Sequence, residues 1–215
     1  MEITWFGHSC FRITERNKAS VVTDPYNHAA VGYKALKLKS DIVTVSHDEP
    51  GHNYVKAVKG TKWQINGAGE YEIGGVFLTA VPTGNGNNDS DDKNMAFVFD
   101  YEGVSIVHLG AIKAVPSRKE VEAFGNVDIL LVPVGGGSSL SAPLAAEVVN
   151  LIEPGIVIPM QFSTPGTSVE LNELSAFLKQ MGLGGIYEEQ ESLKVSKRDI
   201  PGETRVTVLS YKRAA

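Results

Sequence analysis

Residues 42–53 read Ile42-Val43-Thr44-Val45-Ser46-His47-Asp48-Glu49-Pro50-Gly51-His52-Asn53. The first five form a continuous run rich in apolar and β-branched residues, which is the pattern of a strand covered on both faces. Such strands belong to α/β sheets, and these sheets place functional residues in the loop beyond the carboxyl end of a strand. His47 stands at that point. The stretch therefore predicts an α/β fold with a functional loop after this strand.

Short strands are predicted on either side of this stretch. In the first half they cover residues 3–6, 11–14, 20–23, 76–81, 95–100 and 104–108. The second half alternates helices, at 118–124, 142–152 and 169–181, with strands at 128–134, 156–159 and 206–211. Because each half runs from strands to helices, we expect one domain over residues 1–215, a four-layer αββα sandwich of helix, sheet, sheet and helix.

The composition is that of a globular protein with a substantial core. The 215 residues are 42% hydrophobic and carry a net charge of −5, which gives no attraction for nucleic acid or an anionic membrane. The single cysteine, Cys10, rules out an intrachain disulfide. The opening residues form no basic, apolar leader, and no apolar run approaches the ~20 residues that cross a bilayer. These features predict a cytoplasmic protein without nucleic-acid or membrane partners.

Two histidines and two carboxylates lie within the loop after the buried strand. Neutral imidazole is the commonest protein ligand for zinc, and a carboxylate oxygen can complete a site. His47, Glu49 and His52 would converge if the loop folds back on itself. A hydrogen-bonded polar cluster without metal is the competing interpretation, because a single histidine is more often a packed core residue or a surface residue than a metal ligand.

Several segments, in the right order, resemble the metallo-β-lactamase superfamily. The loop at 47–52 lies where that family has His-x-His-x-Asp-His. Four other family markers are found along the chain: Thr4–Phe11, with Gly7-His8-Ser9; Val22-Thr23-Asp24-Pro25; Gly69–Val76; and Val107-His108-Leu109-Gly110. Ile156–Met160 is similar to the strand that the family follows with His-Tyr. The resemblance covers nearly the whole chain and implies a hydrolase with a two-metal centre.

The resemblance also shows where this chain departs from the family. His47 and His52 match the first and last histidines of the motif, whereas Glu49 and Gly51 stand at its middle histidine and its aspartate. The remaining ligand positions fall on the histidine-free loop around Asn85, on Ala111 at the bridging aspartate, and on Gln161 at the last histidine. Glycine and alanine offer no side-chain donor, and amide oxygens are weak zinc ligands. The resemblance therefore implies a degenerate metal site.

Three functions follow from this damaged pattern. The first is a pseudo-enzyme or binding protein that holds an unknown small molecule or protein in a vestigial cleft, with no cofactor. The alternative is a metal-dependent hydrolase of a phosphoester, lactone or amide, with one weakly bound zinc or manganese at a reduced mononuclear site. Its ligands would be His47, Glu49 and His52, and its pocket would be lined by His8, Asp24, Asp48, Asn85, Ala111 and Gln161. The third is a structural subunit of a homo-oligomer. The sequence assigns no catalytic residue.

Overall fold

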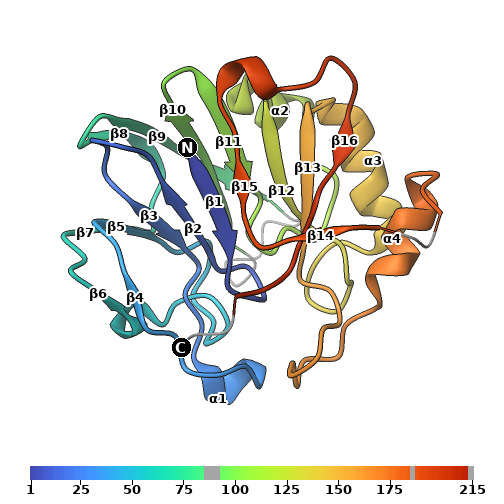
Figure 1. Cartoon of the computed structure of the whole chain (residues 1–215), viewed down its shortest axis with the longest axis horizontal. Helices are drawn as coiled ribbons and strands as arrows, with labels where there is room; N and C mark the ends of the chain where they lie inside the picture. Colours follow the sequence, from blue (N-terminus) through green and yellow to red (C-terminus); the bar gives the residue numbers. More distant parts are fainter. Residues whose placement is uncertain (85–92, 185–186, 213–215) are drawn as a thin grey trace.

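Two β-sheets face each other in the computed structural model, which describes residues 1–84, 93–184 and 187–212 (Figure 1). The six-stranded sheet has the order β15-β1-β2-β3-β5-β7 and the seven-stranded sheet the order β16-β13-β12-β11-β10-β9-β8. The first sheet contains β1 (Glu2–Trp5), β2 (Phe11–Thr14), β3 (Val21–Thr23), β5 (Ile42–Thr44), β7 (Trp63–Ile65) and β15 (Leu193–Lys194). The second contains β8 (Gly69–Ile73), β9 (Val76–Thr83), β10 (Asn94–Tyr101), β11 (Val104–His108), β12 (Ile129–Pro133), β13 (Ile156–Met160) and β16 (Arg205–Val206). Two short pairs join β4 (Leu38–Lys39) to β6 (Val58–Lys59), and β14 (Glu189–Gln190) to β17 (Val208–Leu209).

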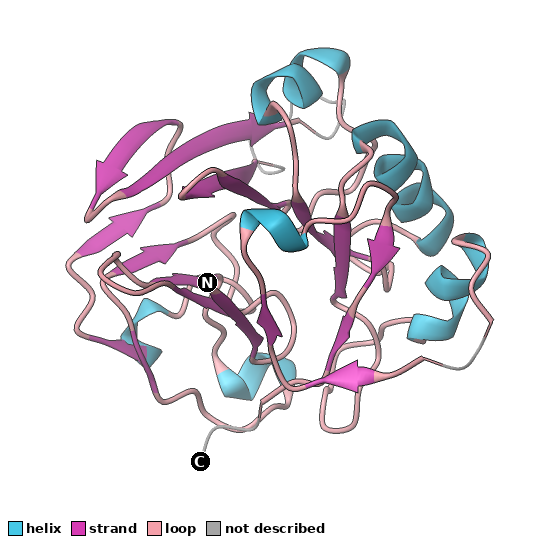
Figure 2. Cartoon of the chain, turned by 45° about the horizontal axis from the view of Figure 1, so that its top comes forward, coloured by secondary structure: helices cyan, strands magenta, loops and turns pink. Residues whose placement is uncertain are grey.

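Helices lie outside the two sheets. Helices α2 (Arg118–Phe124), α3 (Ala142–Ile152) and α4 (Leu174–Gln180) lie on the side of the second sheet, and α1 (His28–Val31) on the side of the first (Figures 1 and 2). Short 3₁₀ turns occur at η1 (Val55–Ala57) and η3 (Lys197–Asp199). In the described part of the chain no helix is long and apolar enough to cross a membrane. The α/β class and the layer order predicted from the sequence are confirmed.

The core explains why the central strands are apolar on both faces. Along β5, Ile42 packs in the large cluster between the sheets, and its neighbour Val43 packs in a second cluster. That second cluster also contains Val31 of α1, so it covers the outer face of the first sheet. Because successive residues of a strand point to opposite faces, a strand that is covered on both sides buries all of its side chains, and apolar or β-branched residues are favoured at each position.

Two helix predictions have different outcomes. Helix α2 covers the residues that the sequence predicts, 118–124, and begins with a capping box of Ser117 and Glu120. The helix predicted from residue 169 begins only at Leu174. Its first part is committed elsewhere, because the Asn172 amide donates to the Gly135 carbonyl and the Asn172 carbonyl accepts from Ser163. Local helical spacing is overridden there by backbone hydrogen bonds between loops.

The carboxyl ends of the parallel strands meet along one edge of the molecule. In the first sheet β1, β3 and β5 run in the same direction, and in the second β11, β12 and β13 do so. The Gln161 amide, just after β13, donates to the His8 carbonyl, just after β1, at 3.2 Å. This bond joins the two sheets at the edge where α/β proteins place their sites.

Candidate metal centre

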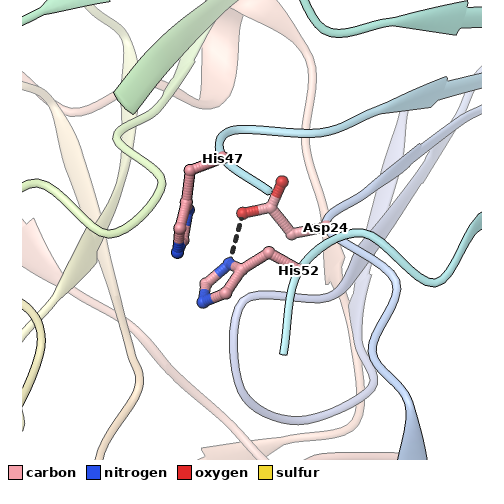
Figure 3. Close-up of side chains that lie close together, drawn as sticks. All are labelled: Asp24, His47 and His52. Atoms are coloured by element: carbon pink, nitrogen blue, oxygen red, sulfur yellow. Dashed lines mark hydrogen bonds and ion pairs between the residues drawn. The ribbon is translucent and has the colours of Figure 1, made fainter. Parts of the chain in front are cut away.

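Asp24, His47 and His52 come together at this edge. One ligand atom from each lies within 4.8 Å of the others (Figure 3). Asp24 follows β3, His47 follows β5, and His52 lies in the loop after it. That loop is pinned by its backbone, since the Pro50 carbonyl accepts from the Asn27 amide at 2.8 Å and the His52 amide donates to the Glu49 carbonyl at 2.8 Å. The loop therefore folds back and carries His52 over Asp24.

Asp24 is a fully buried carboxylate surrounded by donors. It accepts hydrogen bonds from the Ser46 amide at 2.8 Å, the Ser46 hydroxyl at 2.5 Å and Nδ1 of His52 at 2.7 Å. Burial alone would raise its pKa, but the His52 hydrogen bond, the neighbouring imidazoles of His52 and His108, and Ser46 together lower the pKa of Asp24 to about 2. Asp24 is therefore an anion in the folded protein at neutral pH.

The hydrogen bond to Asp24 fixes the orientation of His52. Because Nδ1 carries the proton donated to the carboxylate, Nε2 presents its lone pair to the interior of the site. Nε2 of His8 lies 3.1 Å from this atom, and Nε2 of Gln161 lies 3.4 Å from it. A carboxylate behind a histidine is the usual arrangement that orients a metal ligand and raises its basicity. Asp24 thus acts on His52 in the geometry of such a pair.

His47 forms the open side of the group. Its side chain is 14% exposed, its ring centroid lies 4.0 Å from that of His52, and its Nδ1 is 3.0 Å from the Ser46 hydroxyl. Burial and the adjacent His52 lower the pKa of His47, while Asp24 and Glu49 oppose the shift. The neutral imidazole is favoured, which is the form that binds a metal.

A further layer of buried polar residues holds His8 and Gln161 in place. Nε2 of Gln161 donates to the Ser9 hydroxyl at 2.5 Å, and Nε2 of His108 lies 3.0 Å from the Ser9 carbonyl. The Gly110 amide donates to the other ring nitrogen, Nδ1 of His108, at 3.2 Å. His108 therefore carries its proton on Nε2, and both of its ring nitrogens are hydrogen-bonded to the backbone. His108 therefore positions the turn that carries His8 and offers no free nitrogen to a metal.

The residues of the group fit a divalent metal ion. His47 and His52 offer imidazole nitrogens, and Asp24 adds a buried negative charge that a cation would balance. Burial, together with the neighbouring His52, lowers the pKa of His8 well below its ordinary value, which makes a third neutral imidazole beside them. Nδ1 of His8 is buried with no hydrogen-bond partner in the described structure, so the hydrogen bonding of this ring is made through Nε2.

The structure places the residues expected at the site in two groups. His8, Asp24, His47, His52 and Gln161 lie together. Glu49 is on the rim, with its side chain 59% exposed and Oε2 3.6 Å from Nε2 of His47.

The other expected pocket residues contact different partners. Asp48 is exposed and accepts from the Asn53 side chain at 2.6 Å. The buried Ala111 donates its amide to Oδ1 of Asn94 at 3.0 Å, and Asn85 lies outside the described residues. Sequence reasoning missed Ser46, whose hydroxyl bridges Asp24 and His47; the available signal was a hydroxyl residue directly before an expected ligand.

Comparisons with known proteins identify the family of this chain. A family model described as a β-lactamase superfamily domain matches residues 2–161. A UPF0173 protein of Pyrococcus abyssi is 31% identical over 189 residues, covering 77% of this chain and 85% of its own length. A UPF0173 metal-dependent hydrolase of Thermoplasma acidophilum is 27% identical, covering 76% of this chain and 84% of its own. A crystal structure from Thermotoga maritima, of a protein assigned to the Zn-dependent hydrolases of the metallo-β-lactamase superfamily, is 33% identical and covers 97% of both chains with a TM-score of 0.78.

These findings correct one prediction. The expectation of a pseudo-enzyme or binding protein that has lost most of its metal ligands is wrong, because Asp24, His47 and His52 form a group able to hold a metal and the similar proteins are metal-dependent hydrolases. The prediction counted ligands at the motif positions and gave Asp24 only a place in the pocket lining, whereas the fold brings its carboxylate into the group with His47 and His52. The chain belongs to the metallo-β-lactamase superfamily and, within it, to the UPF0173 metal-dependent hydrolase family.

Proposed function

We propose that this protein is a metal-dependent hydrolase that works with one divalent metal ion, zinc or manganese, held at the group of Asp24, His47 and His52. The observation that carries the proposal is that group itself, with its ligand atoms within 4.8 Å of one another and Asp24 bonded to Nδ1 of His52. A single metal is proposed in place of two because Ala111 and Gly51 offer no side-chain ligand at the positions where the family has aspartates.

The chain's own residues prepare this site for hydrolysis. A metal ion bound there would supply Lewis acidity and lower the pKa of a water molecule toward ~7. Asp24 holds the proton on Nδ1 of His52, so that Nε2 stays available as a donor of its lone pair. Ser46 keeps that carboxylate in place with two hydrogen bonds. His52 is buried, whereas the side chain of His47 is 14% exposed.

Glu49 is the residue that we propose as the general base. It stands on the open side, with Oε2 3.6 Å from Nε2 of His47, and its side chain is largely in solvent. A solvated carboxylate beside a metal ligand can take a proton from the attacking water and return it to the leaving group. The substrate that this arrangement favours is a small molecule with a phosphoester, lactone or amide bond. We propose that it acts in the cytoplasm, since a single buried cysteine suits a reducing compartment.

Metal analysis joined to an activity screen tests the proposal. Protein purified without chelator is analysed for metal content, stripped, reloaded with zinc or manganese, and assayed on chromogenic phosphoesters, lactones and amides. Bound metal and hydrolysis are expected together, and both should be lost in the His47→Ala, His52→Ala double variant. His28→Ala, which removes an exposed histidine on α1, is the control and should change neither. A metal-free protein whose melting temperature does not rise in excess zinc would overturn the proposal, because a ligand specific to the native state stabilises it.

A further inference from the structure

Gly51 leaves a space in the site that the ring of His8 occupies. A Cβ atom built on Gly51 would lie 3.1 Å from Nε2 of His8 and 3.5 Å from its Cδ2. Gly51 has the position that the family motif gives to an aspartate, so its missing side chain would have pointed to the place where this nitrogen now lies. His8 reaches that place from the turn after β1, a different segment of the chain.

The contact between His8 and His52 is a hydrogen bond, and its length is also close to the separation of two ligands of one metal ion. Their Nε2 atoms are 3.1 Å apart. Two nitrogens bound at about 2.0–2.1 Å in a tetrahedral zinc site lie about 3.3 Å from each other. The distance from Oδ2 of Asp24 to Nδ1 of His52 is shorter, at 2.7 Å, and the two atoms form a hydrogen bond. The two contacts engage different nitrogens of His52: Asp24 lies at Nδ1 and orients the ring, whereas His8 lies at Nε2, the nitrogen that is left for a metal ion.

The backbone holds His8 firmly in this orientation. Its carbonyl accepts from Nε1 of Trp5 at 3.0 Å and from the Gln161 amide at 3.2 Å, and the ring is almost completely buried. Its φ angle is 49°, in the left-handed region that glycine adopts without steric cost and histidine does not. Nδ1 of the buried ring has no hydrogen-bond partner, so the ring adds little to the stability of the fold. The placement of His8 is therefore explained by its other nitrogen, Nε2, which lies in the site.

We infer that His8 is a metal ligand that replaces the missing side chain at Gly51, giving a site of three imidazoles from His8, His47 and His52 with Asp24 behind His52. This inference rests on the proposed function, because it names a ligand of the same metal ion. In the metal-free protein Nδ1 of His52 holds the proton that Asp24 accepts, so Nε2 of His8 is the donor in its contact with Nε2 of His52. On metal binding the proton of His8 moves from Nε2 to Nδ1, so that its lone pair turns to the ion without a net change of charge.

The decisive variant is His8→Gly, which removes the ring and relieves the left-handed backbone. Asn17→Gly is the matched control, since Asn17 also has a left-handed φ, of 59°, in an exposed turn. Zinc affinity should fall by at least about 100-fold in His8→Gly, above the range for outer partners of a ligand, and stay unchanged in the control. X-ray absorption at the zinc edge should count three imidazoles in the native protein and two in the variant.

A second variant tests the relation to Gly51. Adding Gly51→Asp to His8→Gly should restore zinc affinity, because the carboxylate then enters the space that the ring has left and residue 51 has no left-handed φ to strain it. Equal affinity in the single and double variants would overturn the exchange of one position for the other. A native affinity retained within about 3-fold in His8→Gly would overturn the ligand role while leaving the hydrolase intact. Native protein that binds zinc through three imidazoles but hydrolyses nothing would overturn the function alone, and native protein that binds no metal would overturn both.

Discussion

Replacing Asp24 by asparagine should weaken the fold moderately and the metal centre strongly. The asparagine side chain keeps one acceptor oxygen and puts an amide group, a donor, in place of the other. If the oxygen stays on the Ser46 amide, the new amide faces the Ser46 hydroxyl and Nδ1 of His52, which are both hydrogen-bonded to Oδ2 in the native protein. His52 must then carry its proton on Nε2 and turn its lone pair away from the metal.

The magnitude follows from the bonds that are lost. Two hydrogen bonds to a buried charge, at about 1.5–3 kcal/mol each, become neutral or unmade, and we expect about 2–4 kcal/mol less stability in the metal-free protein. Losing the partner behind a metal-bound histidine typically lowers metal affinity about 10–100-fold. Urea unfolding of the stripped protein measures the first quantity, and zinc competition with a chromogenic chelator measures the second.

Asp41→Asn is the matched control for this prediction. Asp41 also accepts from a serine amide and hydroxyl, those of Ser20, but it is part-exposed and belongs to another part of the first sheet. Its substitution should leave zinc affinity unchanged. An affinity in Asp24→Asn within about 3-fold of the native value would refute the orienting role. A complete loss of binding, equal to that of His52→Ala, would show instead that Asp24 is itself a ligand.

Three further predictions concern the same edge of the molecule. Glu49→Gln should keep its metal, as measured by elemental analysis, and lose about 10²–10⁴-fold in kcat as expected of a missing general base; loss of the metal would make Glu49 a ligand. Gly110→Ala should lower the free energy of unfolding in urea by at least about 2 kcal/mol. The φ of Gly110 is 63°, and the new Cβ would lie 2.4 Å from Oδ1 of Asn94 and 2.5 Å from Cβ of Ser46. An unchanged midpoint of unfolding would contradict this. Folding lowers the pKa of Asp24 from 3.8 to about 2, so its ionised carboxylate contributes fully to stability above pH 3.8. The metal-free protein should therefore lose about 2 kcal/mol of unfolding free energy as the pH falls from 3.8 to 2, and Asp24→Asn should not show this pH dependence.

The sequence predicted the fold because each central strand carries its own signature. The run at 42–46 is rich in apolar and β-branched residues, and the structure covers β5 on both faces. Strands with weaker patterns escaped prediction: β7 has two exposed residues, including Trp63, and β8 is exposed or half-buried throughout. Both are edge strands, so pairing with a neighbour fixes them and burial does not.

The site was harder to predict because its residues come from separate segments. His47 and His52 were predicted from their spacing in one loop. Asp24 lies far from them in the sequence and reaches His52 only because β3 and β5 pair in parallel, with Thr23 opposite Thr44. A motif position tells which side chain is present there, but it does not tell which other segment of the chain occupies the space when that side chain is missing. The ring of His8 beside Gly51 is such a case, and no periodicity or spacing connects the two residues.

Backbone strain adds an independent argument that this edge is functional. Three of the residues that line it have left-handed backbones without being glycine: His8 at φ 49°, Asp24 at 39° and Gln161 at 52°. They follow β1, β3 and β13, so the strain is imposed where strands from both sheets end. Such conformations cost about 1–3 kcal/mol each, and glycine would avoid most of that cost. The backbone conformation alone would favour glycine at all three positions. The side chains of His8, Asp24 and Gln161 must therefore serve the polar cluster around His52, and the strained backbone is the consequence of aiming three side chains from separate strands at one point.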